Sequence, residues 1–235
     1  MDTNDMSNKF FLPAAVVVAG LFIAGAVIWS GSHPAQAPGT AGTGAAPAPS
    51  VNIKDITTTG DPFIGKADAP ITIAEWSDYQ CPYCKQFELT TLPQIVKDYV
   101  DTGKAKVVFM DFTFLGNDSV AGALYGRSVW KLYPDQYFAW RTAMFNAQDE
   151  EGDKGFGNAA TIDKLDATVP GLDAAKIAAD VKANATAYQA AIDADKAEAG
   201  KAGVNATPSF VIGTQLIQGA YPYATFQAAL DAASK

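Results

Sequence analysis

The chain has only two cysteines, Cys81 and Cys84, and both lie in a single Cys-Pro-Tyr-Cys motif. An apolar run at residues 71–76 precedes the motif, and an amphipathic segment at 81–100 begins with it. This order predicts a buried strand, a short loop and a helix that starts at the first cysteine. Backbone N–H groups and the helix dipole at such a start lower the pKa of a thiol below its free value of about 8.5.

The cysteine count limits what this pair can be. A structural zinc site takes a full tetrahedral set of Cys or His ligands, whereas this chain offers two cysteines and one distant histidine, His33. A purely structural disulfide is a second alternative, but closing so short a loop removes little entropy from the unfolded chain. We therefore favour a dithiol that opens and closes, and we expect neither a metal nor another cofactor.

The N-terminal region predicts a membrane anchor. Residues 10–29 form a run of 20 residues without a charged side chain, and a helix of that length spans about 30 Å, the thickness of a bilayer core. Because Lys9 precedes the run, we expect residues 1–9 in the cytoplasm and the rest of the chain outside it, where disulfides persist. A cleaved signal peptide is the alternative, since residues 35–37 (Ala-Gln-Ala) resemble a cleavage site, but the apolar run is long for a signal.

The remaining chain divides into a linker and one domain. Residues 30–50 are uncharged and rich in Pro, Ala, Gly, Ser and Thr, which is typical of a linker. Residues 51–235 are long enough for one well-buried domain, which we expect to be monomeric. The net charge of -8 argues against nucleic acid as a partner.

The hydrophobic pattern of this domain predicts a βαβ unit, a helical insertion and a ββα unit. The strands at 71–76 and 106–112 should be parallel, because the helix at 81–100 connects them; Pro93 should kink that helix. The insertion covers about 117–200. The other elements expected are an edge strand at 51–56, helices beginning at Ser119 and Pro134, helices at 173–184 and 186–199, strands at 209–212 and 215–218, and a closing helix at 223–233.

Three segments together resemble the DsbA-like thiol:disulfide oxidoreductases, most of all the membrane-anchored members. The segments are residues 75–88 (EWSDYQCPYCKQFE), 203–210 (GVNATPSF) and 219–223 (GAYPY), and the resemblance extends over about 61–233. It implies a thioredoxin-like α/β fold with a helical insertion. It also implies reduced or unfolded exported proteins as substrates and a membrane-embedded reoxidase as the electron acceptor.

The resemblance also implies roles for individual residues. Cys81 is the expected nucleophile, exposed at the helix start; Cys84, which closes a redox-active disulfide with it, is less exposed and resolves mixed disulfides. Pro82 stiffens the loop without removing an N–H that the first helical turn needs, and Pro82 and Tyr83 are expected to contact substrate.

Three further residues complete the expected site. Pro208 matches the cis-proline of the family, which would hold the backbone of Thr207 where an extended substrate segment can pair with it; an ordinary turn proline is the alternative. Glu75 matches a buried acidic residue whose raised pKa would let it shuttle the proton of Cys84. The alternative for Glu75 is a carboxylate paired with a lysine such as Lys106.

Two positions depart from the strongly oxidising members of the family. Tyr83 replaces a histidine whose cation stabilises the thiolate, and Thr207 stands where those members tend to have Val. We therefore expect a Cys81 pKa and a reduction potential less extreme than theirs. The favoured function is an anchored extracytoplasmic oxidase that introduces disulfides into exported proteins. The alternatives are a reductase or isomerase of the same fold, and a tethered chaperone or scaffold with an inert disulfide.

Overall fold

The computed structural model describes residues 51–149 and 155–235. The expected anchor at 10–29, the linker at 30–50 and the cytoplasmic residues 1–9 lie outside the described residues. No helix in the described part of the chain has the length and apolar character needed to cross a bilayer.

The described strands form one mixed sheet in the order β1-β3-β2-β4-β5. The central strands β2 (Ile71–Ser77) and β3 (Ala105–Asp111) are parallel, as the crossover helix between them predicts. The outer strands all pair antiparallel: β1 (Phe63–Ile64) with β3, β4 (Ser209–Ile212) with β2, and β5 (Gln215–Gln218) with β4. The βαβ and ββα units of the sequence are therefore confirmed.

The helical segment after the cysteine motif is continuous but not uniformly α-helical. It consists of α2 (Pro82–Gln86), a π-helical turn η2 (Phe87–Thr91), α3 (Leu92–Ile95) and a second π-helical turn η3 (Val96–Val100). Pro93 lies in the first turn of α3, directly after the first π turn. A proline lacks the N–H that a regular helix needs, and a π turn is where a helix accommodates such an interruption.

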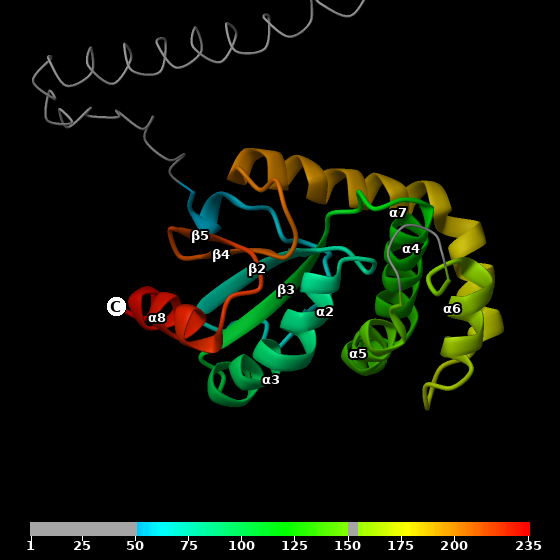
Figure 1. Cartoon of the computed structure of the whole chain (residues 1–235), viewed down its shortest axis with the longest axis horizontal. Helices are drawn as coiled ribbons and strands as arrows, with labels where there is room; N and C mark the ends of the chain where they lie inside the picture. The colour runs from blue at the N-terminus through cyan, green and yellow to red at the C-terminus, as the bar shows by residue number, and fades with distance from the viewer. Residues whose placement is uncertain (1–50, 150–154) are drawn as a thin grey trace, which may run out of the picture. The chain divides into compact units, whose positions relative to one another are not determined.

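The insertion and the closing unit supply the other helices. Figure 1 shows α4 (Asn117–Leu132), α5 (Tyr137–Ala147) and α6 (Ala159–Asp166) grouped at one side of the sheet, and α7 (Ala174–Ala202) running from that group back across the sheet. A short 3₁₀ turn, η4 (Pro134–Gln136), joins α4 to α5. The closing helix α8 (Tyr223–Ala233) buries Phe226, Ala229 and Leu230, as expected.

Three expected elements are wrong in detail. Residues 51–56 do not form a strand: they contain the 3₁₀ turn η1 (Ile53–Asp55), because the Asn52 side chain accepts the Lys54 N–H and turns the chain. Ser119 does not cap α4; the cap is Gly116 with φ 110°, and Ser119 is fully buried inside the helix. The two alanine-rich helices are the single 29-residue α7, because Asn184 bonds back to the Asp180 carbonyl within the helix instead of ending it.

The two faces of the sheet carry separate cores. Residues alternate between faces along a strand, so Ile71, Ile73 and Glu75 of β2 face one core and Ala74 and Trp76 face the other. The first core also contains residues of the helical segment 82–100, α5 and α8. The second is covered by the end of α7 and by residues near 51–56. Glu75 therefore lies under the helix that begins with the cysteine motif.

A buried ion cluster joins the insertion to the sheet. Arg127 of α4 donates to Asp61 (2.7 Å), to Asp111 at the end of β3 (2.8 Å) and to Asp195 of α7. Burial raises the pKa of Asp195 to about 8; the charge of Asp111 adds to this shift, and Arg127 opposes it. Arg127 is thus the cation that lets α4, α7 and the sheet meet.

Replacing Arg127 with methionine should lower the free energy of unfolding by about 3–5 kcal/mol, because it leaves buried carboxylates without their cation. The matched control is Lys131→Met on the same helix. Lys131 is 48% exposed and pairs with Asp180, so its loss should cost less than about 1 kcal/mol. Urea unfolding followed by circular dichroism measures both changes, and similar costs for the two variants would contradict this account of Arg127.

Candidate active site

The cysteine motif lies where β2 passes into helix α2. Cys81 is the N-cap residue, with extended dihedral angles (φ -81°, ψ 120°), and Pro82 occupies the first helical position. The Cys81 carbonyl accepts the Lys85 N–H at 3.1 Å, the first helical hydrogen bond. The expected helix start at the first cysteine is therefore confirmed, and the N–H groups of the first turn are directed toward the Cys81 sulfur.

The surroundings of Cys81 favour its thiolate. Its pKa is lowered to about 6, first by a hydrogen bond from the Cys84 thiol, then by Thr207 and by the backbone N–H groups of Cys84 and Tyr83. Burial opposes these contacts but does not outweigh them. At neutral pH most of this side chain is therefore ionised, and a thiolate is the nucleophilic form of cysteine.

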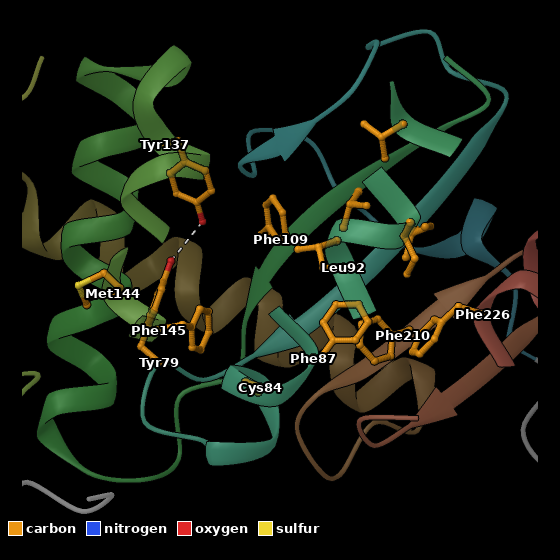
Figure 2. Packing of buried hydrophobic residues seen from close by; sticks show 14 of the residues in the cluster. Tyr79, Cys84, Phe87, Leu92, Phe109, Tyr137, Met144, Phe145, Phe210 and Phe226 are labelled. Atoms are coloured by element: carbon orange, nitrogen blue, oxygen red, sulfur yellow. Dashed lines mark hydrogen bonds between the residues drawn. The ribbon is translucent and has the colours of Figure 1, made fainter. Parts of the chain in front are cut away.

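Cys84 has the opposite character. It is 1% exposed, and burial raises the pKa of its thiol well above the usual value, with the neighbouring Cys81 sulfur raising it further. Figure 2 shows Cys84 between two aromatic groups, Tyr79 and Phe145 on one side and Phe87, Phe210 and Phe226 on the other. Both cysteines are free thiols in the structure. The pair thus consists of one acidic thiol and one that keeps its proton.

The expectation that Cys81 is openly exposed is wrong. Only 4% of the residue is accessible, because the loop that carries Thr207 and Pro208 lies over the thiol. In its protonated form, Cys81 donates its S–H to the Thr207 carbonyl, whose oxygen lies 3.4 Å from the sulfur. A reacting group must therefore approach Cys81 along this loop and not from open solvent.

The Thr207–Pro208 peptide bond is cis, as the family resemblance implies. Strand β4 begins directly after this bond and pairs with β2, which brings residues 126 positions apart in sequence into contact. The Thr207 side chain lowers the pKa of each thiol. Its hydroxyl is buried and has no hydrogen-bond partner among the described residues.

A groove of about 350 Å³ runs beside this loop. Tyr83 and Tyr221 are part of its lining, and they are 62% and 49% exposed, which is unusual for large aromatic side chains. No charged side chain of residues 51–149 or 155–235 lines the groove. Its full lining is Tyr83, Gln86, Ala206, Thr207, Gln218, Gly219, Ala220 and Tyr221.

Glu75 is fully buried and paired, but not with a lysine. Arg141 of α5 donates to Glu75 at 2.6 Å and to Glu88 at 3.0 Å, whereas Lys106 donates to the Ala67 carbonyl. Burial raises the pKa of Glu75 to about 7; Arg141 counteracts this shift and the charge of Glu88 adds to it. One oxygen of Glu75 has no hydrogen-bond partner in the described part of the chain.

Sequence reasoning missed Arg141 and Glu88. The signal available was weak: Arg141 is the one charged residue of a mostly aromatic and apolar helix, and Glu88 lies one turn after Cys84 on a helix with other charges. Their contact with Glu75 depends on how α5 packs against the helical segment 82–100. Local sequence patterns do not predict this packing. Among residues 51–149 and 155–235, no three Cys, His, Asp or Glu side chains are arranged to bind a metal ion.

The reduced protein should be alkylated at Cys81 only. The rate of reaction with iodoacetamide should rise through a pKa of about 6 and level off above it, because the rate follows the thiolate fraction. Cys84→Ala removes the hydrogen bond that contributes most to the low pKa, so its profile should shift toward the free value of about 8.5. Mass spectrometry locates the adduct. Modification of Cys84 in the folded protein, or an unshifted profile in Cys84→Ala, would contradict this description.

Comparison with known proteins agrees with this geometry. A family model described as Thioredoxin matches residues 57–232. A probable disulfide bond formation protein D from Bacillus anthracis is 26% identical over 153 residues, covering 65% of this chain and 70% of that protein. Disulfide bond formation protein D from Bacillus subtilis (strain 168) is 40% identical over 91 residues, 39% of this chain and 41% of that protein.

A solved structure shows the same fold. The crystal structure of oxidised BdbD from Bacillus subtilis aligns with a TM-score of 0.71 and 25% sequence identity, covering 80% of this chain and 98% of that one. The chain therefore belongs to the thioredoxin family and is a DsbA-like thiol:disulfide oxidoreductase.

Proposed function

We propose that this protein is an extracytoplasmic oxidase that introduces disulfides into exported proteins. It acts by exchange at Cys81 and Cys84, is held to the membrane by residues 10–29 and works as a monomer. Its substrates are reduced or unfolded exported chains, and a membrane-embedded reoxidase accepts the electrons. The observation that carries the proposal is the asymmetry of the dithiol: the pKa of Cys81 is about 6, while that of Cys84 is raised well above its usual value.

This asymmetry favours release of oxidising equivalents. A substrate thiolate attacks the Cys81 sulfur of the Cys81–Cys84 disulfide; a substrate–Cys81 disulfide forms, and Cys84 leaves and takes up a proton. A second substrate thiolate then attacks the substrate sulfur of this mixed disulfide, so that the substrate gains a disulfide and Cys81 leaves as a thiolate. Two electrons have moved from the substrate to the dithiol. A low pKa speeds the departure of Cys81 and stabilises the reduced enzyme, which makes the disulfide more oxidising.

The loop at Thr207 and Pro208 supports a role in binding extended substrate. It borders both the dithiol and the uncharged groove, so a chain whose cysteine reaches Cys81 lies along it. The backbone of Thr207 can pair with such a segment as a neighbouring strand does. Tyr83 and Tyr221 offer aromatic surface to the segment's side chains without selecting for charge.

The direction of electron flow rests on the relatives and on the residues around the thiolate. Two relatives are named for disulfide bond formation, which supports oxidation of substrates. Tyr83 supplies no cation to the Cys81 thiolate, so we expect a milder oxidant than members with histidine at that position. Cys84 and Thr207, which both lower the Cys81 pKa, supply part of the stabilisation that such a cation would give.

Glu75 is proposed to handle the proton that Cys84 gains and loses. It lies on the sheet face under the helix of the cysteine motif, and its pKa of about 7 makes it both a donor and an acceptor near neutral pH. Arg141 holds one carboxylate oxygen and leaves the other without a partner among the described residues. Arg141 is therefore proposed as the residue that orients Glu75.

The oxidised protein should oxidise a reduced, unfolded substrate faster than glutathione disulfide does, and its dithiol should equilibrate with glutathione buffers above about -270 mV, the potential of thioredoxin. Cys84→Ala should accumulate mixed disulfides with exported proteins through Cys81, since the resolving thiol is gone. Cys81→Ala is the matched control and should trap nothing. Gel shifts of alkylated samples follow both reactions.

Other outcomes of this experiment select the alternatives. A potential near or below about -270 mV would indicate a reductase. A disulfide that resists reduction by glutathione, with no trapped substrates, would indicate a tethered scaffold whose disulfide is inert. Either result would remove the oxidase proposal while leaving the fold and the family unchanged.

Glu75→Gln should slow the reduction of the Cys81–Cys84 disulfide by about ten-fold or more at pH 6, because it removes a positioned proton donor. In the parent, the rate corrected for ionisation of the attacking thiol should fall as pH rises through about 7, as Glu75 loses its proton; in Glu75→Gln it should stay flat. Glu88→Gln is the control. Its corrected rate should still fall as pH rises, but at lower pH than in the parent, since Glu88 helps to raise the pKa of Glu75. Rapid-quench mass spectrometry gives the rates. A parent-like profile in Glu75→Gln would exclude the proton role.

A further inference from the structure

Gln148, at the C-terminal end of α5, makes direct contact with the active-site loop. Its side-chain amide donates two hydrogen bonds, to the Tyr79 carbonyl at 2.8 Å and to the Cys81 carbonyl at 3.1 Å. The residue is buried. Because a primary amide has two N–H donors, one side chain of the insertion satisfies both carbonyls that flank Gln80.

Other contacts hold Gln148 in this place. Its backbone carbonyl accepts the Lys85 ammonium at 2.7 Å, which ties it to helix α2. Three residues earlier on α5, the Phe145 ring stacks on the Tyr79 ring with centroids 5.3 Å apart; Figure 2 shows this pair beside Cys84. The end of α5 is therefore anchored to the loop on both sides of the cysteine motif.

The hydrogen bond to the Cys81 carbonyl matters because it fixes the orientation of a peptide next to the reactive thiol. This carbonyl belongs to the peptide that leads into α2, and it also accepts the first helical hydrogen bond, from Lys85. The orientation of this peptide decides where the N–H groups of Tyr83 and Cys84 lie relative to the Cys81 sulfur. Those N–H groups are among the contacts that lower the Cys81 pKa.

We propose that Gln148 is a positioning residue for the Cys81 thiolate. By holding the carbonyls of Tyr79 and Cys81, it keeps the first turn of α2 aimed at the sulfur, so that the helical insertion contributes to the acidity of the reactive thiol. The inference rests on Cys81 being the reactive thiol of the proposed function. Without Gln148, the Tyr79 carbonyl loses its donor and the Cys81 carbonyl keeps only the Lys85 N–H. A buried acceptor without a donor is costly, so the loop rotates to find another.

The test is the pH dependence of Cys81 alkylation in the full chain. Gln148→Met has nearly the same length but no donor, and it should raise the pKa of Cys81 from about 6 by about one unit, which slows alkylation at pH 6 about five-fold. Gln148→Asn keeps a donor on a shorter side chain and should fall between the parent and Gln148→Met. Iodoacetamide labelling with mass spectrometry gives the full profile of each protein.

Ser128→Ala is the matched control for a purely structural effect. Ser128 is fully buried in the insertion and donates to Asp180 at 3.0 Å, away from the loop. The Ser128→Ala substitution should lower the melting temperature and leave the pH profile of Cys81 alkylation unchanged. If Gln148→Met does not fold, Gln148→Asn decides the matter, because it must still shift the profile to higher pH.

Two results would overturn the inference. The first is that the pH profile of Cys81 alkylation in Gln148→Met coincides with that of the parent. If only Gln148→Asn folds, the same result in that variant counts. The other is a shift in Ser128→Ala as large as that in the Gln148 variants. Neither result bears on the proposed function, which fails separately if the parent itself shows no lowered Cys81 pKa.

Discussion

The hydrogen bond from the Cys84 thiol to the Cys81 sulfur is the interaction on which this site depends. It makes the largest contribution to the low pKa of Cys81 and raises the pKa of Cys84 further. The bond is possible because the two residues are one helical turn apart and because Cys81 is the cap that precedes α2. Burial raises the pKa of both thiols. Hydrogen bonds outweigh this effect at Cys81, at the helix start, whereas burial dominates at Cys84, one turn further along the helix.

The helical insertion is part of the site as well as a cover for it. Arg127 fixes α4 and α7 to the sheet through three aspartates. From α5, Arg141 reaches the buried carboxylates of Glu75 and Glu88, and Gln148 reaches the backbone around Cys81. Charge and hydrogen-bond partners for the thioredoxin-like core thus come from a segment inserted between its two halves. A change in how α5 packs should alter the chemistry of the dithiol without touching either cysteine.

The departures from the strongly oxidising members of the family fit this arrangement. Tyr83 replaces the cation that those members carry between the cysteines, and its ring is directed to the groove instead. Stabilisation of the thiolate falls to uncharged groups: the Cys84 thiol, the Thr207 side chain and the first N–H groups of α2. Neutral hydrogen bonds are weaker than charge-assisted ones, which is the physical reason to expect a milder oxidant.

The sequence by itself determined the parts of this protein that depend on neighbouring residues. The periodicity of residues 71–100 and the spacing of Cys81 and Cys84 predicted the strand, the helix and the thiol at its start, and the family motif predicted the cis bond at Pro208. Tertiary structure alone decided what surrounds these elements. It buried Cys81 under the loop at Thr207 and paired Glu75 with a cation more than sixty residues away. Local periodicity reports which face of an element is apolar, but which side chain from another element meets that face is set by packing across the whole fold.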